Sequence, residues 1–144
     1  MRTIRRDFSK FGNFSELIDR GLVSAFLTFA PGPITQGRVI DIATGGLSTI
    51  DGSISGARNM SVTVTAASTM SFTFTTNPGH VFYPGTISFS ANDTESGVHF
   101  EIRLHGQLAD RQARVGYVLG FGKFENDSWK HFLNLVRKSC GNEN

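Results

Sequence analysis

The feature that most constrains this chain is a strict two-residue alternation of apolar and polar side chains between residues 60 and 105. The runs that carry it are MSVTVTA (60–66), MSFTFTT (70–76), TISFSA (86–91) and VHFEIRLHG (98–106). Alternation of this period places one side of each strand against a core and the other toward solvent. Gly, Asn and Pro residues between the runs supply the turns. The region therefore predicts an antiparallel β-meander.

Turn signals recur about every ten residues, which favours a curved sheet or a partial barrel over a parallel sheet. Earlier in the chain, RVIDIA (38–43) predicts one more strand, and LSTIDG (47–52) and SISG (53–56) predict short ones.

Near the start of the chain, NFSELIDRGLVSAFLTF (13–29) spaces its apolar residues close to the helical period,. This spacing predicts an N-terminal helix, with Asn13 or Ser15 as its cap. The part VSAFLTF (23–29) also fits a strand, so that alternative stays open,.

The clearest helix signal is ENDSWKHFLNLVRKSCG (125–141). An apolar stripe runs along it at Trp129, Phe132, Leu133 and Val136,. Asn126 or Asp127 is expected to cap the helix and Gly141 to end it. We expect the stripe to pack on the sheet and to leave a pocket where the sheet stays uncovered. The preceding segment, 108–120, fits either a helix or a last strand.

The size and composition of the chain fit one α+β domain over residues 1–144,. A formal net charge of +2 is too small to indicate a nucleic-acid partner,. The single cysteine, Cys140, allows neither a disulfide framework nor a cysteine metal site within one chain,. No apolar run approaches the length of a transmembrane helix, and the start of the chain is polar and basic,. We therefore expect a cytoplasmic protein.

Signals for catalysis are weak. The four histidines form no metal-binding spacing, and nucleotide-binding glycine patterns and nucleophile elbows do not occur,. His99 and His105 would lie about 20 Å apart on a strand, too far to share one metal ion. Together with Glu101 and Arg103 they line one strand face, which is either a wet outer surface or a polar wall inside a barrel. We therefore assign no catalytic residue, no metal and no cofactor, and the question of whether the chain catalyses a reaction stays open.

The loop TTNPGHVFYPG (75–85) contains two Pro-Gly dipeptides. Asn77-Pro78-Gly79 predicts a type II turn, and Pro84-Gly85 repeats the pattern. His80, Phe82 and Tyr83 lie between the two dipeptides. This segment is either a plain hairpin connection or a portal that gates a cavity at the open end of the sheet.

Arg2 and Arg6 form an R-x-x-x-R spacing, and GRVIDIATGGL follows with Asp41, Ala43 and Gly46. The two segments resemble the bipartite motif of PilZ domains, which bind cyclic di-GMP on a small barrel. In that family arginines hold the phosphates and guanine bases, and a (D/N)-x-S-x-x-G turn holds the nucleotide. The resemblance implies a receptor that uses Arg2, Arg6 and the Asp41 to Gly46 turn. Ala43 departs from the family, which has serine there.

The overall pattern of a helix, a long meander and a C-terminal helix with Trp129 is similar to the START-like helix-grip superfamily. The likeness covers most of the chain but rests on no specific motif. Members enclose an apolar ligand, such as a lipid, between sheet and helix, and some are cyclases or hydrolases. The resemblance implies that Phe72, Phe74, Phe89 and Phe100 share the interior with the Trp129 face.

We therefore expect a domain that binds a small, largely apolar molecule between curved sheet and C-terminal helix. The expected ligand-binding residues are Phe72, Phe74, His80, Phe82, Tyr83, Phe89, Phe100 and Trp129. One alternative is the cyclic di-GMP receptor. Another is a structural or interaction module, in which the Ser/Thr-rich face of residues 61–75 packs on a partner.

Overall fold

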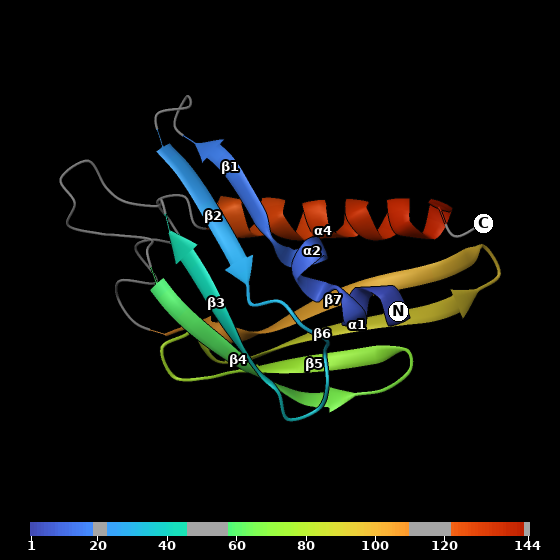
Figure 1. The fold of residues 1–144 in the computed structure, drawn as a ribbon, viewed down its shortest axis with the longest axis horizontal. Coiled ribbons are helices and arrows are strands. Elements are labelled where there is room, and N and C mark those ends of the chain that lie inside the picture. Colours follow the sequence, from blue (N-terminus) through green and yellow to red (C-terminus); the bar gives the residue numbers. More distant parts are fainter. Residues whose placement is uncertain (19–22, 46–57, 110–121, 143–144) are drawn as a thin grey trace.

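The computed structural model describes residues 1–18, 23–45, 58–109 and 122–142, and this part of the chain has an α+β fold. One antiparallel sheet holds seven strands in chain order (Figure 1). The strands are β1 (Phe14–Ile18), β2 (Val23–Phe29), β3 (Val39–Gly45), β4 (Arg58–Ala67), β5 (Ser71–Thr76), β6 (Phe82–Thr94) and β7 (Gly97–Leu108). The helices are α1 (Arg2–Arg6), α2 (Phe8–Gly12) and α4 (Gly122–Asn142).

The sheet is curled, so that β1 and β2 stand steeply against the long β6–β7 hairpin (Figure 1). Helix α4 runs along the open side of the curl, and α2 lies between α4 and the sheet. The predicted meander, its curvature and the packing of the C-terminal helix are confirmed.

The burial of the middle strands follows the alternation in the sequence. Val62 and Val64 on β4 are fully buried, and so are Phe72 on β5 and Phe89 on β6. The serines and threonines between them are half-buried or exposed. Some of these hydroxyls bond across strands, as Thr73 does with Ser88 at 3.1 Å. The inner face of the sheet is thus apolar and its outer face polar.

The helix predicted over residues 13–29 is wrong, because this segment forms the β1–β2 hairpin. Its part 23–29 matches the alternative strand reading. Leu27 and Phe29 are buried and Thr28 is exposed, which is strand alternation. Asn13 caps no helix start; its Oδ1 accepts a hydrogen bond of 2.7 Å from the backbone nitrogen of Phe29. The apolar residues of the two short strands, taken together, therefore happen to be spaced close to the helical period.

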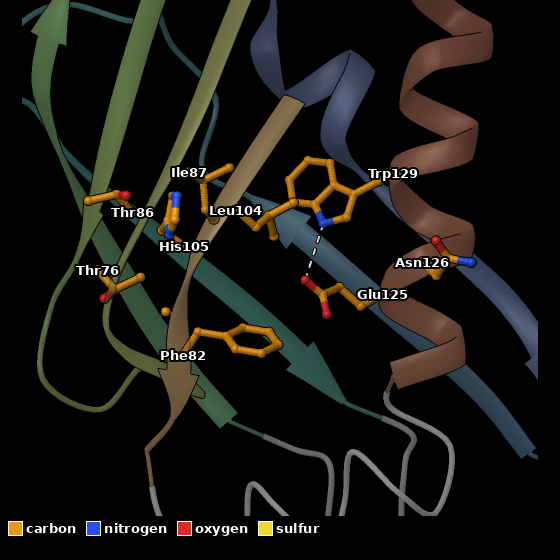
Figure 2. A pocket seen from close by; sticks show the side chains of 10 residues that line it. Thr76, Phe82, Thr86, Ile87, Leu104, His105, Glu125, Asn126 and Trp129 are labelled. Atoms are coloured by element: carbon orange, nitrogen blue, oxygen red, sulfur yellow. Dashed lines mark hydrogen bonds between the residues drawn. The ribbon is translucent and has the colours of Figure 1, made fainter. Parts of the chain in front are cut away.

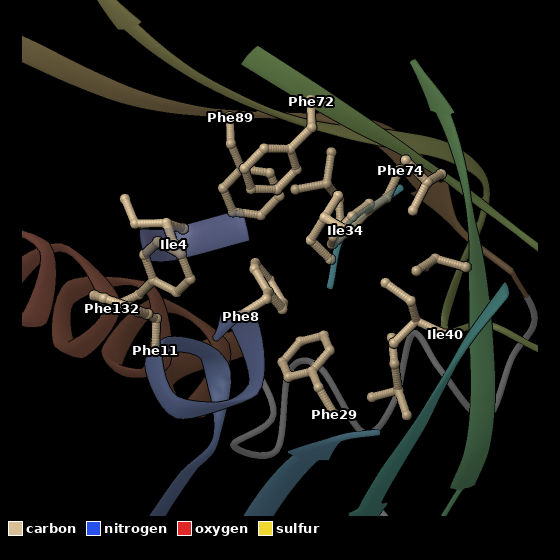
Figure 3. Close-up of a cluster of buried hydrophobic side chains, with 14 of the residues drawn as sticks. Ile4, Phe8, Phe11, Phe29, Ile34, Ile40, Phe72, Phe74, Phe89 and Phe132 are labelled. Atoms are coloured by element: carbon tan, nitrogen blue, oxygen red, sulfur yellow. The ribbon is translucent and has the colours of Figure 1, made fainter. Parts of the chain in front are cut away.

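The N-terminal helices lie earlier, in the segment that reads as polar and basic. Their apolar residues, Ile4, Phe8 and Phe11, are buried. Phe8 is 1% exposed and lies at the centre of an aromatic cluster (Figure 3). Its ring centroid is within 6 Å of five other phenylalanine rings, those of Phe29, Phe72, Phe74, Phe89 and Phe132. Phe8 thereby joins α2, the sheet and α4 into one core.

Helix α4 begins at Gly122, so Asn126 and Asp127 lie inside it and the predicted cap is wrong. The helix also runs through Gly141 to Asn142. Phe132 and Val136 are buried against the core, as the stripe predicted. Leu133, however, is 38% exposed. Leu135, half-buried, packs on the core instead.

The turn at Asn77-Pro78-Gly79 is confirmed. Gly79 has a φ of +98°, and the His80 nitrogen donates to the Asn77 carbonyl oxygen at 3.1 Å. Pro84-Gly85 forms no second turn, because it lies inside β6 where the register with β7 shifts. A Cβ at Gly85 would meet the His105 carbonyl oxygen at 2.7 Å. Glycine is therefore needed there for the close approach of the two strands.

The strands predicted at 47–52 and 53–56 and most of the ambiguous segment 108–120 lie outside the described residues.

Candidate functional site

A cleft of about 310 Å³ lies between the β6–β7 hairpin and the first turns of α4 (Figure 2). Its described lining residues are Thr76, Phe82, Thr86, Ile87, Leu104, His105, Gly106, Glu125, Asn126 and Trp129. The cleft therefore occupies the place where the sequence predicted a pocket, between curved sheet and C-terminal helix.

A second, deeper hollow of about 40 Å³ lies inside the curl, room for about one water molecule,. Its wall is formed by apolar side chains of β2 to β6, together with His80. The cleft and the hollow share Phe82, Ile87, Glu125 and Trp129. These four residues form the boundary between the solvent-facing cleft and the apolar interior.

Glu125 brings a carboxyl group to this boundary. Figure 2 shows the carboxyl between the indole of Trp129 and the ring of Phe82. Burial raises the pKa of Glu125 to about 7, although the hydrogen bond from Trp129 acts in the opposite direction. Its place in the first turn of α4 also favours the ionised form, and burial outweighs that too,. At neutral pH the group is therefore present in both protonation states.

The helical spacing of Glu125 and Trp129 fixes their contact. Residues four apart lie on the same face of a helix, and here the indole Nε1 donates to Oε1 at 3.3 Å,. One turn of α4 thus presents both a carboxyl group and an aromatic ring to the sheet.

On the opposite side of the cleft from α4, β6 and β7 each have a glycine at the same paired position. Gly85 pairs with Gly106 in the strand register, next to the shift at Phe82. The Thr76 hydroxyl donates to the Gly85 carbonyl oxygen at 3.1 Å and holds this part of β6 to β5. The paired glycines allow the two backbones to approach closely, since a Cβ at Gly106 would lie 3.2 Å from the Gly85 Cα.

The structure brings four of the predicted ligand-binding residues to the cleft or the hollow. Phe82 and Trp129 line both, and Phe74 and His80 line the hollow. His80 is 4% exposed, and its Nδ1 accepts a hydrogen bond of 3.0 Å from the Phe82 nitrogen. The proton of a neutral His80 therefore resides on Nε2.

The other four predicted residues are not among those that line either space. Phe72 and Phe89 are fully buried in the cluster around Phe8. The half-buried ring of Phe100 stacks on Phe132 at 6.2 Å. Tyr83 is 37% exposed. Their positions in the core and on the surface give them structural contacts rather than contacts with the cleft.

Ile87, Leu104, Glu125 and His105 line the cleft but were not predicted to bind a ligand. Ile87 and Leu104 carry the alternation signal and pair with each other across β6 and β7. For Glu125 the available signal was its spacing of four residues from Trp129.

The polar face of β7 is largely solvent-facing. The Arg103 guanidinium bonds to Glu101 and holds the pKa of that carboxyl below its usual value. His99 lies 3.7 Å from Glu101, and the His99 side chain is 60% exposed. His105 differs from these three, because it lies beside the cleft.

The residues of the PilZ resemblance lie on separate elements. Arg6 on α1 forms an ion pair with Asp7 at 2.9 Å, and Asp41 is exposed on β3. Gly46 lies outside the described residues. Arg5, between the two motif arginines, donates to the backbone oxygens of Ile34 and Ser68. Cyclic di-GMP binding stays a prediction.

Comparison of the chain with protein-family models, with curated proteins and with solved structures finds no match. Within the described ranges, no three His, Cys, Asp or Glu side chains gather as a metal site. None of the helices described has the length and apolar character to cross a bilayer.

Proposed function

We propose that this domain binds a small, largely apolar molecule in the cleft between the β6–β7 hairpin and α4. The observation that carries the proposal is the cleft itself, which opens at the surface and borders the apolar hollow inside the curl. Its volume is near the lower end of the range of about 300–1,000 Å³ typical of small-molecule sites.

The walls of the cleft support an apolar ligand. Phe82, Ile87, Leu104 and Trp129 provide aromatic and aliphatic surface on both sides. Leu104 is 44% exposed, which leaves apolar area for a ligand to cover. A few polar groups, chiefly Glu125, would orient that ligand, as in other small-molecule sites.

The helix-grip likeness agrees with this proposal at the level of gross pattern. Members of that superfamily enclose apolar ligands, lipids among them, between a curved sheet and a C-terminal helix. The tightly packed cluster around Phe8 fills much of the interior of this chain. A compact ligand that enters from the cleft therefore fits better than a long-chain lipid enclosed by the whole sheet.

The test is binding of the neutral, apolar dye Nile Red, followed by the emission of the dye. Leu104→Trp fills the cleft from β7 and is expected to weaken binding at least about tenfold. Val98→Trp is the matched control, because Val98 lies on the same strand face, is 59% exposed and is absent from the described cleft lining. It should bind the dye as the parent chain does.

Native mass spectrometry of freshly purified protein complements this test by searching for a co-purified small molecule. Absence of saturable dye binding by the parent chain would contradict the proposal. Equal weakening by both tryptophan variants would place the dye outside the cleft.

A further inference from the structure

We infer that the cleft prefers apolar molecules that carry a protonated amine, with the ammonium group paired to the carboxylate of Glu125. This inference rests on the proposed function and names the class of ligand. It follows from the acceptor groups, the charges and the aromatic surfaces at the boundary between cleft and hollow.

The first support is that the carboxyl group of Glu125 accepts fewer hydrogen bonds from the protein than its oxygens can accept. Oε1 of Glu125 accepts the indole N–H of Trp129, whereas Oε2 has no hydrogen-bond donor among the described residues. A carboxylate has about four lone-pair positions, so one neutral N–H leaves most of them open. A ligand ammonium group supplies three donors to this oxygen pair.

The second support is the charge of the surroundings. Among the described lining residues of the cleft and the hollow, none is lysine or arginine. Besides Glu125, the titratable groups among these described lining residues are His80 and His105. An ionised Glu125 therefore has no fixed cation beside it in this part of the chain. A buried carboxylate gains most from a partner of opposite charge that also donates hydrogen bonds.

The third support is aromatic surface on two sides of the carboxyl group. The indole of Trp129 and the ring of Phe82 flank Glu125 in Figure 2. These rings offer apolar surface to the hydrocarbon part of an amine ligand, while the indole turns its N–H edge rather than its face toward the carboxyl group,. The hydrogen bond to Glu125 also fixes the orientation of the indole. A cation that reaches the carboxylate thus lies near both rings.

The same geometry disfavours other polar groups. A ligand carboxylate would face Glu125 with like charge, which disfavours the pair. An alcohol can bond to either protonation state of Glu125, but it gains only a neutral hydrogen bond. Charge-assisted bonds are roughly twice as strong as neutral ones. The expected preference of the amine over a shape-matched alcohol is about tenfold.

The preference should depend on pH. An ammonium ligand favours the ionised form of Glu125, so its binding displaces a proton from the carboxyl group. The pKa of Glu125 is raised to about 7 in the free protein. Affinity for the amine should therefore rise about sevenfold between pH 5.5 and 7.5, and then level off, because the uncharged form of Glu125 still binds the amine as it binds the alcohol. His80 and His105 line the same spaces, so the contribution of Glu125 is taken from the difference between parent and variant.

The experiment measures displacement of Nile Red by 4-phenylbutylamine, 4-phenylbutan-1-ol and 4-phenylbutanoate at pH 7.5. For the parent chain we expect the amine to compete about tenfold better than the alcohol, and the carboxylate to compete least. Glu125→Gln keeps the shape of the side chain and removes the charge. In this variant amine and alcohol should compete equally.

Calorimetry of the parent chain in two buffers of different ionisation enthalpy provides a second readout that needs no variant. It should show release of protons on binding the amine near pH 7, and none on binding the alcohol. If the dye binds but amine and alcohol compete equally, or if no proton is released, the inference is wrong while the proposed function stands. If the dye does not bind at all, the proposed function fails first.

Discussion

The indole nitrogen of Trp129 donates a hydrogen bond to Oε1 of Glu125, 3.3 Å away and one turn earlier on α4. The contact joins the only tryptophan of the chain to a carboxyl group whose pKa is raised by burial. Both side chains face the β6–β7 hairpin across the cleft (Figure 2). The properties of this pair can be measured before any ligand is known.

The first prediction concerns stability and pH. The pKa of Glu125 is about 7 in the folded chain, against 4.5 for a glutamate free in water. Between these values the folded state binds more protons than the unfolded state, so the contribution of Glu125 to stability falls as the pH rises. Glu125→Gln removes this loss. The free energy of unfolding of the variant, relative to that of the parent, should therefore increase by on the order of 3 kcal/mol from pH 4 to pH 8.

Urea unfolding of both proteins across this pH range measures the effect. Asp7 and Glu101 have lowered pKa values because of their arginine partners, and they act in the opposite direction. Their contributions cancel in the difference between parent and variant. A difference that does not change with pH would show that Glu125 titrates as an exposed carboxyl group.

The second prediction concerns the core. Phe8→Ala removes the ring that contacts β2, β6 and α4, and should cost about 3–5 kcal/mol of unfolding free energy,. Leu133→Ala is the control on α4, because its side chain is 38% exposed, and it should cost less than about 1 kcal/mol,. Urea unfolding compares the two. Equal costs would mean that α2 does not pack as described.

The central sheet was predictable because its physical requirement is local. One buried face demands alternation, and residues such as Val62, Val64 and Phe72 satisfy it over an uninterrupted run,. Their burial can therefore be predicted without knowing what covers them. The turn at Gly79 was predictable for the same reason, since its positive φ requires a local sequence,.

The N-terminal region was not predictable in this way. In residues 13–29 two short strands join closely, and their combined apolar residues match the helical period by coincidence. Only pairing with β3 decides between helix and strand, and that contact is distant in sequence. Phe8 lies in a basic segment where no apolar stripe is visible. Its role arises from the meeting of α2, α4 and the sheet.

The site could be predicted in outline alone. Trp129 could be predicted as a site residue from the amphipathic pattern of the helix, and Phe82 from the loop with two Pro-Gly dipeptides. Glu125 was not, because a carboxylate in the first turn of a helix ordinarily faces solvent. Its burial depends on the β6–β7 hairpin, which brings Ile87 and Phe82 over the start of α4.

The third prediction separates the arginines of α1. Arg5 bonds to the carbonyl oxygens of Ile34 and Ser68 and ties the helix to two connections of the sheet. Arg5→Lys cannot reproduce this forked geometry and should cost about 1–2 kcal/mol. Arg2→Lys should be neutral, since Arg2 is exposed,. Thermal unfolding distinguishes them, and equal melting temperatures would contradict the role of Arg5.

The fourth prediction compares two glycines that are needed for different reasons. Gly79→Ala has space for its methyl group but is strained by a φ of +98°, so it should cost about 1–2 kcal/mol,. Gly85→Ala places its methyl 2.7 Å from the His105 carbonyl oxygen and should cost more,. Urea unfolding ranks the two variants. The reverse order would contradict the close approach of β6 and β7.

We propose that the cleft between the β6–β7 hairpin and α4 holds a small apolar molecule. Because Trp129 is the only tryptophan, its indole N–H gives a single side-chain signal in a ¹⁵N-correlated NMR spectrum. The most direct measurement follows this signal during titration with 4-phenylbutan-1-ol. Binding in the cleft should produce a saturable shift at Trp129 and at the methyl groups of Ile87, with the methyl groups of Val98 unchanged. An unmoved indole signal, or equal shifts at Val98, would contradict it.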